Sequence, residues 1–216
     1  DAAIDAYKNH HLKKIVVISS SMVFESADVF PTPESVIGSI PPPKSTYGFQ
    51  KLACEYFALG AFQQYGLPYT IVRPFNCVGI GESRAKTGKE IKSGNIKLAM
   101  SHVVPDLVQK ILKGQDPVHI LGNGKQIRHY TYGKDLAEGI IKATFSPEGL
   151  NNDFNISTNE STTVLELAET IWGKINPDKP FRYILEKGFP NDVQKRVPDT
   201  SKAKEILKHL QQIGLL

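Results

Sequence analysis

The chain has 216 residues, of which 40% are hydrophobic and 22% charged, a composition typical of globular proteins with a sizeable core. No apolar run approaches the length that spans a bilayer, so we expect no membrane partner. The formal net charge is only +4 and the two signs are scattered along the chain, so we expect no nucleic-acid partner.

The sequence contains two cysteines and six histidines. Cys54 and Cys77 lie far apart without partner-rich surroundings, which favours reduced thiols in a cytoplasmic protein over a disulfide framework. The histidines show no His-Glu-x-x-His or comparable ligand spacing. We therefore expect a cytoplasmic protein without a bound metal.

The first strong element is the apolar run 15–18, in which every residue is β-branched. Such a run is typical of a fully buried strand in a parallel sheet, because both faces of that strand are covered. Three serines, Ser19, Ser20 and Ser21, would then stand at the carboxyl end of the strand. Prolines and the lack of a period predict a loop over 24–44, above the same edge of the sheet.

Ser45 can cap a helix that ends near Gly66. The expected apolar face of this helix consists of Phe49, Leu52, Ala53, Tyr56 and Phe57. Tyr47 and Lys51 are four residues apart and therefore share a face of its first turns. A nearby ammonium favours the phenolate form of a tyrosine, which can act as a general base. With a serine hydroxyl bonded to the same oxygen, these groups suit proton removal from an alcohol coupled to hydride loss.

The strand 69–72 follows this helix, so the two strands form a parallel crossover unit. Ser20 and Asn76 would then stand at neighbouring carboxyl ends, where ligands of doubly wound sheets bind. The remaining apolar patterns predict helices over 103–112, 135–143 and 164–174 and one capped by Asp199, with strands over 118–121, 154–156 and 181–184.

Four motifs extend this pattern along the chain: residues 18–24, 45–51, 73–79 and 122–128. In these motifs and in their order, the chain resembles the extended short-chain dehydrogenase/reductase family, the NAD-dependent sugar-nucleotide epimerases and dehydratases. The resemblance implies an α/β fold: a partial Rossmann-type doubly wound parallel sheet with a smaller C-terminal α/β substrate domain. Residues 1–78 and 130–158 would belong to the NAD-binding domain, and 79–129 and 159–216 to the substrate-binding domain.

The resemblance also implies site residues. The implied catalytic residues are Ser20, Tyr47 and Lys51. NAD would be bound by Ser19, Tyr47, Lys51, Pro74 and Phe75. A nucleotide-diphosphate sugar would be bound by Ser21, Asn76, Arg128 and Arg196. Arg128 suits a diphosphate because a guanidinium binds it with two hydrogen bonds. His129 replaces the acid common in the family, and Arg196 would replace a family arginine that is absent near Phe189. The glycine-rich turn that holds a dinucleotide is not found after any strand, and we expect it upstream of Asp1.

Family dehydratases carry an Asp-Glu pair where Ser21 and Met22 stand here. Water elimination lacks its acid and base without that pair, so the resemblance favours an NAD-dependent 4-epimerase of a nucleotide sugar. One alternative is a redox-inactive nucleotide-sugar-binding or assembly module, and another is a simple NAD(P)-dependent reductase. The resemblance further implies a homodimer whose contact includes the helix of Tyr47.

Overall fold

The computed structural model describes residues 1–80, 92–93, 96–97, 102–188 and 193–208. The chain divides into two compact units. The first consists of Asp1–Cys77, His129–Ser161 and Arg196–Leu216, and the second of Val78–Arg128 and Thr162–Lys195. The segment that begins at Arg196 thus belongs to the first unit, whereas the sequence analysis grouped it with the second.

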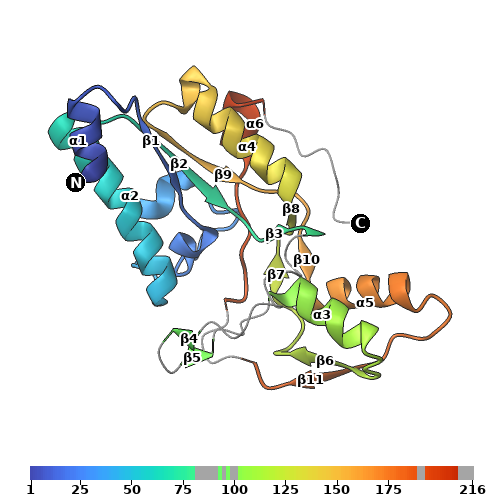
Figure 1. Cartoon of the computed structure of the whole chain (residues 1–216). Helices are drawn as coiled ribbons and strands as arrows, with labels where there is room; N and C mark the ends of the chain where they lie inside the picture. Colours follow the sequence, from blue (N-terminus) through green and yellow to red (C-terminus); the bar gives the residue numbers. More distant parts are fainter. Residues whose placement is uncertain (81–91, 94–95, 98–101, 189–192, 209–216) are drawn as a thin grey trace. The chain divides into compact units, whose positions relative to one another are not determined.

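Three parallel strands in the order β1-β2-β9 form the sheet of the first unit (Figure 1). Their bounds are Ile15–Ile18, Tyr69–Pro74 and Asn152–Ile156. The other elements of this unit are α1 (Ala2–Lys8), η1 (Ser21–Phe24), η2 (Glu34–Gly38), α2 (Thr46–Tyr65), β8 (Thr131–Tyr132), α4 (Gly133–Phe145), η4 (Pro147–Gly149) and α6 (Ser201–Ile206), with β3 (Cys77–Val78) at its boundary. The predicted α/β class with parallel strands is confirmed.

Helices α2 and α4 lie on opposite sides of this sheet (Figure 1). Because successive strand residues point to opposite faces, β2 presents Val72 to one side and Arg73 to the other. Val72 belongs to a buried cluster with Phe154 of β9 and with residues of α4 and α6: Leu136, Ala143, Ala203 and Leu207. Arg73 instead bonds to Glu55 of α2. One face therefore holds an apolar core and the other a buried charge.

Strand β1 has the predicted residues but is not fully buried. Ile15, Val16 and Val17 are half-buried, and Ile18 is 42% exposed. Within the described part of the chain β1 pairs with β2 alone, so it lies at the edge of the sheet. Full burial of a parallel strand needs neighbours along both edges, and that expectation from the apolar run was wrong.

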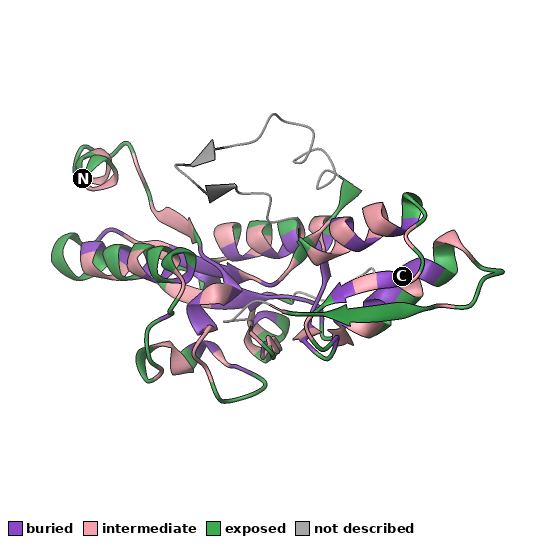
Figure 2. Cartoon of the chain, turned by 90° about the horizontal axis from the view of Figure 1, so that it is seen from below, coloured by how far each residue is buried: buried purple, intermediate pink, exposed green. Residues whose placement is uncertain are grey.

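Helix α2 begins and ends as predicted, because Ser45 Oγ accepts a hydrogen bond from Gly48 N and Gly66 adopts a φ of 70°. Of its predicted apolar face, Leu52 is buried as expected, but the aromatic residues are not. The buried residues are Gly48, Leu52, Glu55, Ala58 and Ala61. The aromatic face is exposed, with values of 55% for Phe49, 56% for Tyr56 and 78% for Phe57 (Figure 2). Apolar spacing identifies a face, but here small residues pack against the neighbouring elements.

Two further helix starts differ slightly from the predictions. Helix α4 begins at Gly133, so Asp135 lies in its first turn, where the residue is 2% exposed, rather than at its cap. Helix α6 has Thr200 at its N-cap position. Asp199 nevertheless bonds the start of this helix, because its Oδ1 accepts a hydrogen bond from Ser201 N at 2.9 Å.

The second unit packs α3 (Val103–Leu112) against α5 (Val164–Ile175). The predicted capping box is present at the start of α5, between Thr163 and Glu166. Strand β6 (Val118–Leu121) pairs in parallel with β11 (Tyr183–Glu186), which begins two residues later than predicted. The short strands are β4 (Lys92–Ser93) with β5 (Ile96–Lys97), and β7 (Ile127–Arg128) with β10 (Thr162–Thr163).

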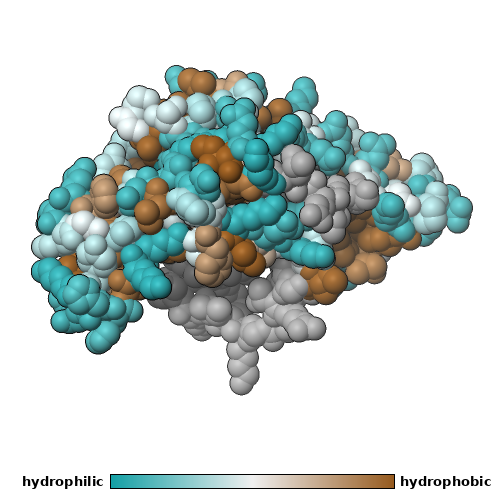
Figure 3. All heavy atoms as spheres, turned by 90° about the horizontal axis from the view of Figure 1, so that it is seen from above, coloured by the Kyte–Doolittle hydropathy of each residue, from teal (hydrophilic) through white to brown (hydrophobic). Residues whose placement is uncertain are grey.

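Among the described residues, no helix combines the length and the apolar character needed to cross a bilayer. The face drawn in Figure 3 carries mostly hydrophilic side chains, interrupted by small apolar patches. Single exposed apolar side chains of this kind are normal on globular proteins.

Candidate active site at the carboxyl end of the first sheet

Lys51 joins helix α2 to the end of strand β1. Its Nζ donates a hydrogen bond of 2.9 Å to the carbonyl oxygen of Ile18, the last residue of the strand. The same ammonium lies 5.8 Å from the centre of the Tyr47 ring. The two residues therefore share a helix face, as their spacing predicts, and that face meets the carboxyl end of the sheet.

Gly48 allows the first turn of α2 to approach the segment after the serines. A Cβ atom at Gly48 would lie 2.7 Å from both the Met22 carbonyl oxygen and Pro43 Cβ, which is closer than side chains tolerate. This contact sets Tyr47 beside η1 while leaving 52% of its side chain exposed. An exposed phenol at the strand end is accessible to a ligand.

The three serines have different surroundings. Ser19 and Ser21 are each 3% exposed, and the Ser19 hydroxyl donates to the carboxylate of Glu55. Ser20 caps η1, because its Oγ accepts a hydrogen bond of 3.2 Å from Met22 N. That bond uses the Ser20 oxygen as an acceptor and leaves the hydroxyl proton to donate elsewhere.

Strand β2 ends at Pro74 and is followed by Phe75 and Asn76, and all three are predicted ligand-binding residues. Pro74 is half-buried, whereas the Phe75 ring is 1% exposed and packs on Phe24 with 6.2 Å between ring centres. Only the backbone of Phe75 can therefore face a ligand. Asn76 adopts a left-handed φ of 34°, and its Oδ1 accepts a hydrogen bond of 3.4 Å from Arg196. The structure thus brings two predicted substrate-binding residues together.

Arg128 belongs to the second unit, in strand β7, and its side chain is largely buried. It donates a hydrogen bond of 2.9 Å to the carbonyl oxygen of Ile127. His129, the next residue, belongs to the first unit. Burial lowers the pKa of His129, whose Nδ1 lies 2.9 Å from the Thr158 carbonyl oxygen, so the imidazole is neutral near pH 7.

Sequence reasoning missed one residue of this region, Glu55. It lies four residues after Lys51, so the helical period places both on one face. The side chain of Glu55 is buried and accepts hydrogen bonds from Ser19 and from Arg73, which is 1% exposed. A charged residue at a helix position that faces the sheet was the available signal.

Parallel strands with helices on both faces and polar residues at their carboxyl ends define the Rossmann-type class of α/β proteins. A model of the NAD dependent epimerase/dehydratase family matches residues 2–157. The chain belongs to this family, and NAD is the family's cofactor.

Relatives of known activity modify nucleotide sugars. UDP-glucuronic acid decarboxylase 3 of Arabidopsis thaliana is 28% identical over 196 residues, which are 90% of this chain and 52% of the relative. UDP-N-acetyl-alpha-D-glucosaminuronate decarboxylase of Bacillus cytotoxicus is 30% identical over 206 residues, 90% of this chain and 57% of the relative. The chain therefore spans about half the length of these relatives.

Among solved structures, the chain is similar to the UDP-glucose 4-epimerase of Thermotoga maritima, determined with UDP-glucose. The two are 30% identical with a TM-score of 0.76, and the match covers 98% of this chain and 62% of the epimerase. Epimerases and decarboxylases of nucleotide sugars thus both stand among the relatives.

The residues present fit one end of an NAD molecule. Tyr47 and Lys51 offer a hydroxyl and an ammonium at the carboxyl edge of the sheet, where dinucleotides bind in such folds. The sequence of 216 residues holds no glycine-rich turn after a strand for the pyrophosphate. The fit therefore concerns only the polar groups of Tyr47 and Lys51.

Proposed function

We propose that the protein containing this chain is an NAD-dependent nucleotide-sugar enzyme, with 4-epimerisation as its reaction. The observation that carries the proposal is the 2.9 Å bond from Lys51 Nζ to the Ile18 carbonyl oxygen. It brings the face of α2 that holds Tyr47 to the strand end that continues into Ser20. A base, a cation and a hydroxyl donor at one sheet edge suit proton removal from an alcohol.

Each of the three residues has a defined task in this proposal. Tyr47 removes the proton from the sugar hydroxyl, and the ammonium of Lys51 stabilises the phenolate that does so. Ser20 donates its hydroxyl proton to the same sugar oxygen and keeps it oriented. NAD, when bound, would supply the hydride acceptor that oxidation of the alcohol needs. Tyr47 and Lys51 would hold its nicotinamide ribose, together with Ser19, Pro74 and the backbone of Phe75.

Substrate contacts form the second part of the proposal. Arg196 and Asn76 bind the nucleotide-diphosphate sugar beside the end of β2, supported by their 3.4 Å hydrogen bond. Ser21 and Arg128 complete the proposed substrate-binding set. The first unit would serve NAD binding and would also hold the substrate-binding residues Ser21, Asn76 and Arg196. Cys54 and Cys77 are exposed and form no disulfide among the described residues, which favours a cytoplasmic location.

Decarboxylation is a second candidate, favoured by the two decarboxylases that are 28% and 30% identical to this chain. Oxidation at C4 of a uronic acid sugar produces a β-keto acid, which loses carbon dioxide readily. The proton step at Tyr47 is the same in both reactions. The substrate therefore decides between them: a neutral hexose allows epimerisation alone, and a uronic acid allows either reaction.

The test uses the full-length gene product with NAD and either UDP-glucose or UDP-glucuronic acid, followed by product analysis. Conversion of UDP-glucose to its 4-epimer supports the proposal, and release of carbon dioxide from UDP-glucuronic acid supports the second candidate. In a parallel incubation with NADH or NADPH in place of NAD, net consumption of the reduced cofactor identifies a reductase. Binding of a nucleotide sugar without turnover by the wild type identifies a binding module.

Tyr47→Phe tests the base in the active wild-type background. We expect turnover to fall about a thousand-fold, because the proton acceptor is lost, while affinity for the sugar nucleotide changes little. Tyr56→Phe is a matched control, since Tyr56 is also exposed on α2, at 56%. Retained turnover in Tyr47→Phe would remove Tyr47 from the mechanism.

We further propose that a second copy of the protein covers the exposed aromatic face of α2. Phe49, Tyr56 and Phe57 lie on one side of the helix, and a stripe of this kind suits an isologous contact between identical helices. Phe57→Glu should convert the dimer to a monomer in sedimentation, because two buried carboxylates would meet. Phe145→Glu, at an equally exposed phenylalanine on α4, should leave the dimer intact.

A further inference from the structure

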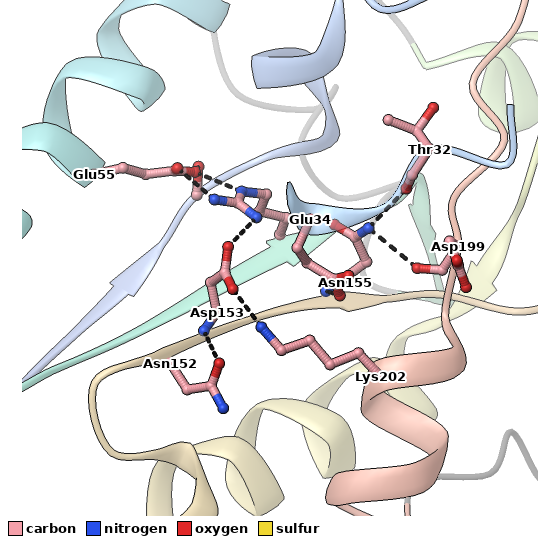
Figure 4. A network of polar contacts seen from close by, with 10 residues as sticks. Thr32, Glu34, Glu55, Asn152, Asp153, Asn155, Asp199 and Lys202 are labelled. Carbon is pink, nitrogen blue, oxygen red and sulfur yellow. Dashed lines mark hydrogen bonds and ion pairs between the residues drawn. The ribbon is translucent and has the colours of Figure 1, made fainter. Parts of the chain in front are cut away.

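Arg73 holds the first unit together through buried charge pairs. Its Nε and Nη2 atoms donate hydrogen bonds to the two carboxylate oxygens of Glu55, at 2.9 and 2.8 Å. Its Nη1 atom donates to Asp153 at 2.7 Å. Lys202 of α6 donates to the other oxygen of Asp153 at 2.6 Å (Figure 4). The pairs therefore connect α2, β2, β9 and α6.

One contact of this network leads to the candidate active site. The hydroxyl of Ser19 donates to Glu55 Oε1, the same oxygen that accepts from Arg73 Nε. Ser19 directly follows strand β1 and directly precedes Ser20, and its backbone N bonds to the Val72 carbonyl oxygen at 2.8 Å. The buried network of charged side chains thus reaches Ser19, the residue next to Ser20, whose hydroxyl is proposed to bind the substrate.

Two successive turns of α2 are attached to two successive residues of the chain. Lys51 bonds to the carbonyl oxygen of Ile18, and Glu55, one turn later on the same face, bonds to the hydroxyl of Ser19. A single contact would let the helix rotate about it. Two contacts one turn apart fix both the rotation and the axial position of the face that carries Tyr47.

We propose that Glu55, oriented by Arg73, is a positioning residue that acts through Ser19 to hold the Tyr47 face of α2 against Ser20. The carboxylate is required because Glu55 accepts three hydrogen bonds, from Ser19 Oγ and from two nitrogens of Arg73. A glutamine would present its own donor to one of these donors. The kinetic consequence rests on the proposed function, whereas the positional consequence does not.

Ser19→Ala removes the contact while Glu55 and Arg73 keep both of their mutual bonds, so no charge loses its partner. Because Ser19 also belongs to the proposed NAD-binding set, the affinity for NAD is measured alongside and should stay unchanged. A misplaced base lowers the rate of the proton step more than it lowers substrate binding. We expect kcat to fall by about ten-fold or more, with KM for the sugar nucleotide changed by less than about two-fold. The acid limb of the kcat–pH profile should also move, since it reports the proton step.

Thr70→Val is the matched control. Thr70 also buries a hydroxyl on the sheet, 0% exposed, which donates to the Gly149 carbonyl oxygen at 2.7 Å. It stands near the amino end of β2, away from Ser19 at the carboxyl edge. Both variants lose one buried hydroxyl, but we expect Thr70→Val to keep kcat within about two-fold and its pH profile unchanged. Equal kcat in the two variants would overturn the proposal.

Amide hydrogen exchange of α2 tests the positional claim without turnover. Ser19→Ala should speed exchange in the first turns of α2, around Gly48 and Lys51, relative to wild type and to Thr70→Val. Unchanged protection there would contradict the positioning role, whatever the enzyme does. If the wild type fails to turn over nucleotide sugars but exchange behaves as expected, only the proposed function is wrong.

Discussion

Two buried polar regions of the first unit lie side by side in Figure 4, and their buried polar groups have different kinds of hydrogen-bond partners. The Arg73 cluster consists of Ser19, Glu55, Arg73, Asp153 and Lys202 and joins side chain to side chain through charges. The Asn155 cluster consists of Thr32, Glu34, Asn155 and Asp199 and joins side chains to the backbone.

The difference lies in what each cluster fixes. In the Asn155 cluster, Nδ2 of Asn155 donates to the carbonyl oxygens of Thr32 and Asp199 at 3.0 and 3.1 Å. These bonds secure the loop before α2 and the start of α6 to strand β9. The Arg73 cluster secures helix α2 itself. Backbone partners fix the path of the chain, while charged partners fix the orientation of the helix that carries Tyr47.

The largest expected effect comes from removing the charge at Arg73. Arg73→Met removes the cation that lies between the carboxylates of Glu55 and Asp153, so the two negative charges repel each other. Glu55 is only 2% exposed, so its charge is left buried without this partner. We expect the free energy of unfolding to drop by about 4 kcal/mol, measured by urea denaturation. Arg73→Met with Glu55→Leu should recover part of that loss, because the pair is then replaced by apolar groups. A double variant as unstable as the single one would contradict this account.

A smaller effect is expected in the Asn155 cluster. Asn155→Ala removes the donor to two buried carbonyl oxygens, those of Thr32 and Asp199. Because these partners are neutral, we expect a loss of about 2 kcal/mol in the free energy of unfolding. Asn152→Ala serves as the control, since that side chain is only half-buried and its amide donates to the Glu148 carbonyl oxygen. If Asn155→Ala lost more free energy of unfolding than Arg73→Met, the comparison between the two clusters would be reversed.

Local chemistry made much of this unit predictable. The cap at Ser45, the left-handed Gly66 and the four-residue spacing of Tyr47 and Lys51 depend on neighbours in the sequence, and the structure has all three. The strand positions followed from apolar runs in the same way. The predicted roles of the site residues stay predictions, although Lys51 does meet the carboxyl end of β1.

The rest depended on partners far apart in the sequence. Glu55 and Arg73 are 18 residues apart, and Arg73 and Asp153 are 80 residues apart. No local sequence pattern can therefore predict that they pair. The same limit explains the error over α2. Its aromatic stripe has the helical period, but whether Phe57 faces the sheet or the surface depends on what packs against the other side.

The smallest expected effect concerns Glu34, the acid of the Asn155 cluster, and appears as a pH dependence. Burial raises the pKa of Glu34 above its ordinary value of 4.5, although the bond from Asn155 N and the charge of Lys202 oppose that shift. The folded chain therefore binds this proton more tightly than the unfolded chain does. The stabilisation is fully present below the unfolded pKa and is lost as pH rises through the folded pKa.

Glu34→Gln cannot titrate and keeps an oxygen for the 2.7 Å bond from Asn155 N. The wild type should therefore lose stability relative to Glu34→Gln as pH rises above the ordinary value of 4.5, as measured by urea denaturation at several pH values. His129 titrates alike in both proteins and cancels in the difference. Asp153, whose charge acts on Glu34, stays ionised over this range because its own pKa is lowered from 3.8. Parallel stability curves would mean that the bond from Asn155 N and the charge of Lys202 fully offset the effect of burial on the pKa of Glu34. The contrast between the two clusters would then disappear.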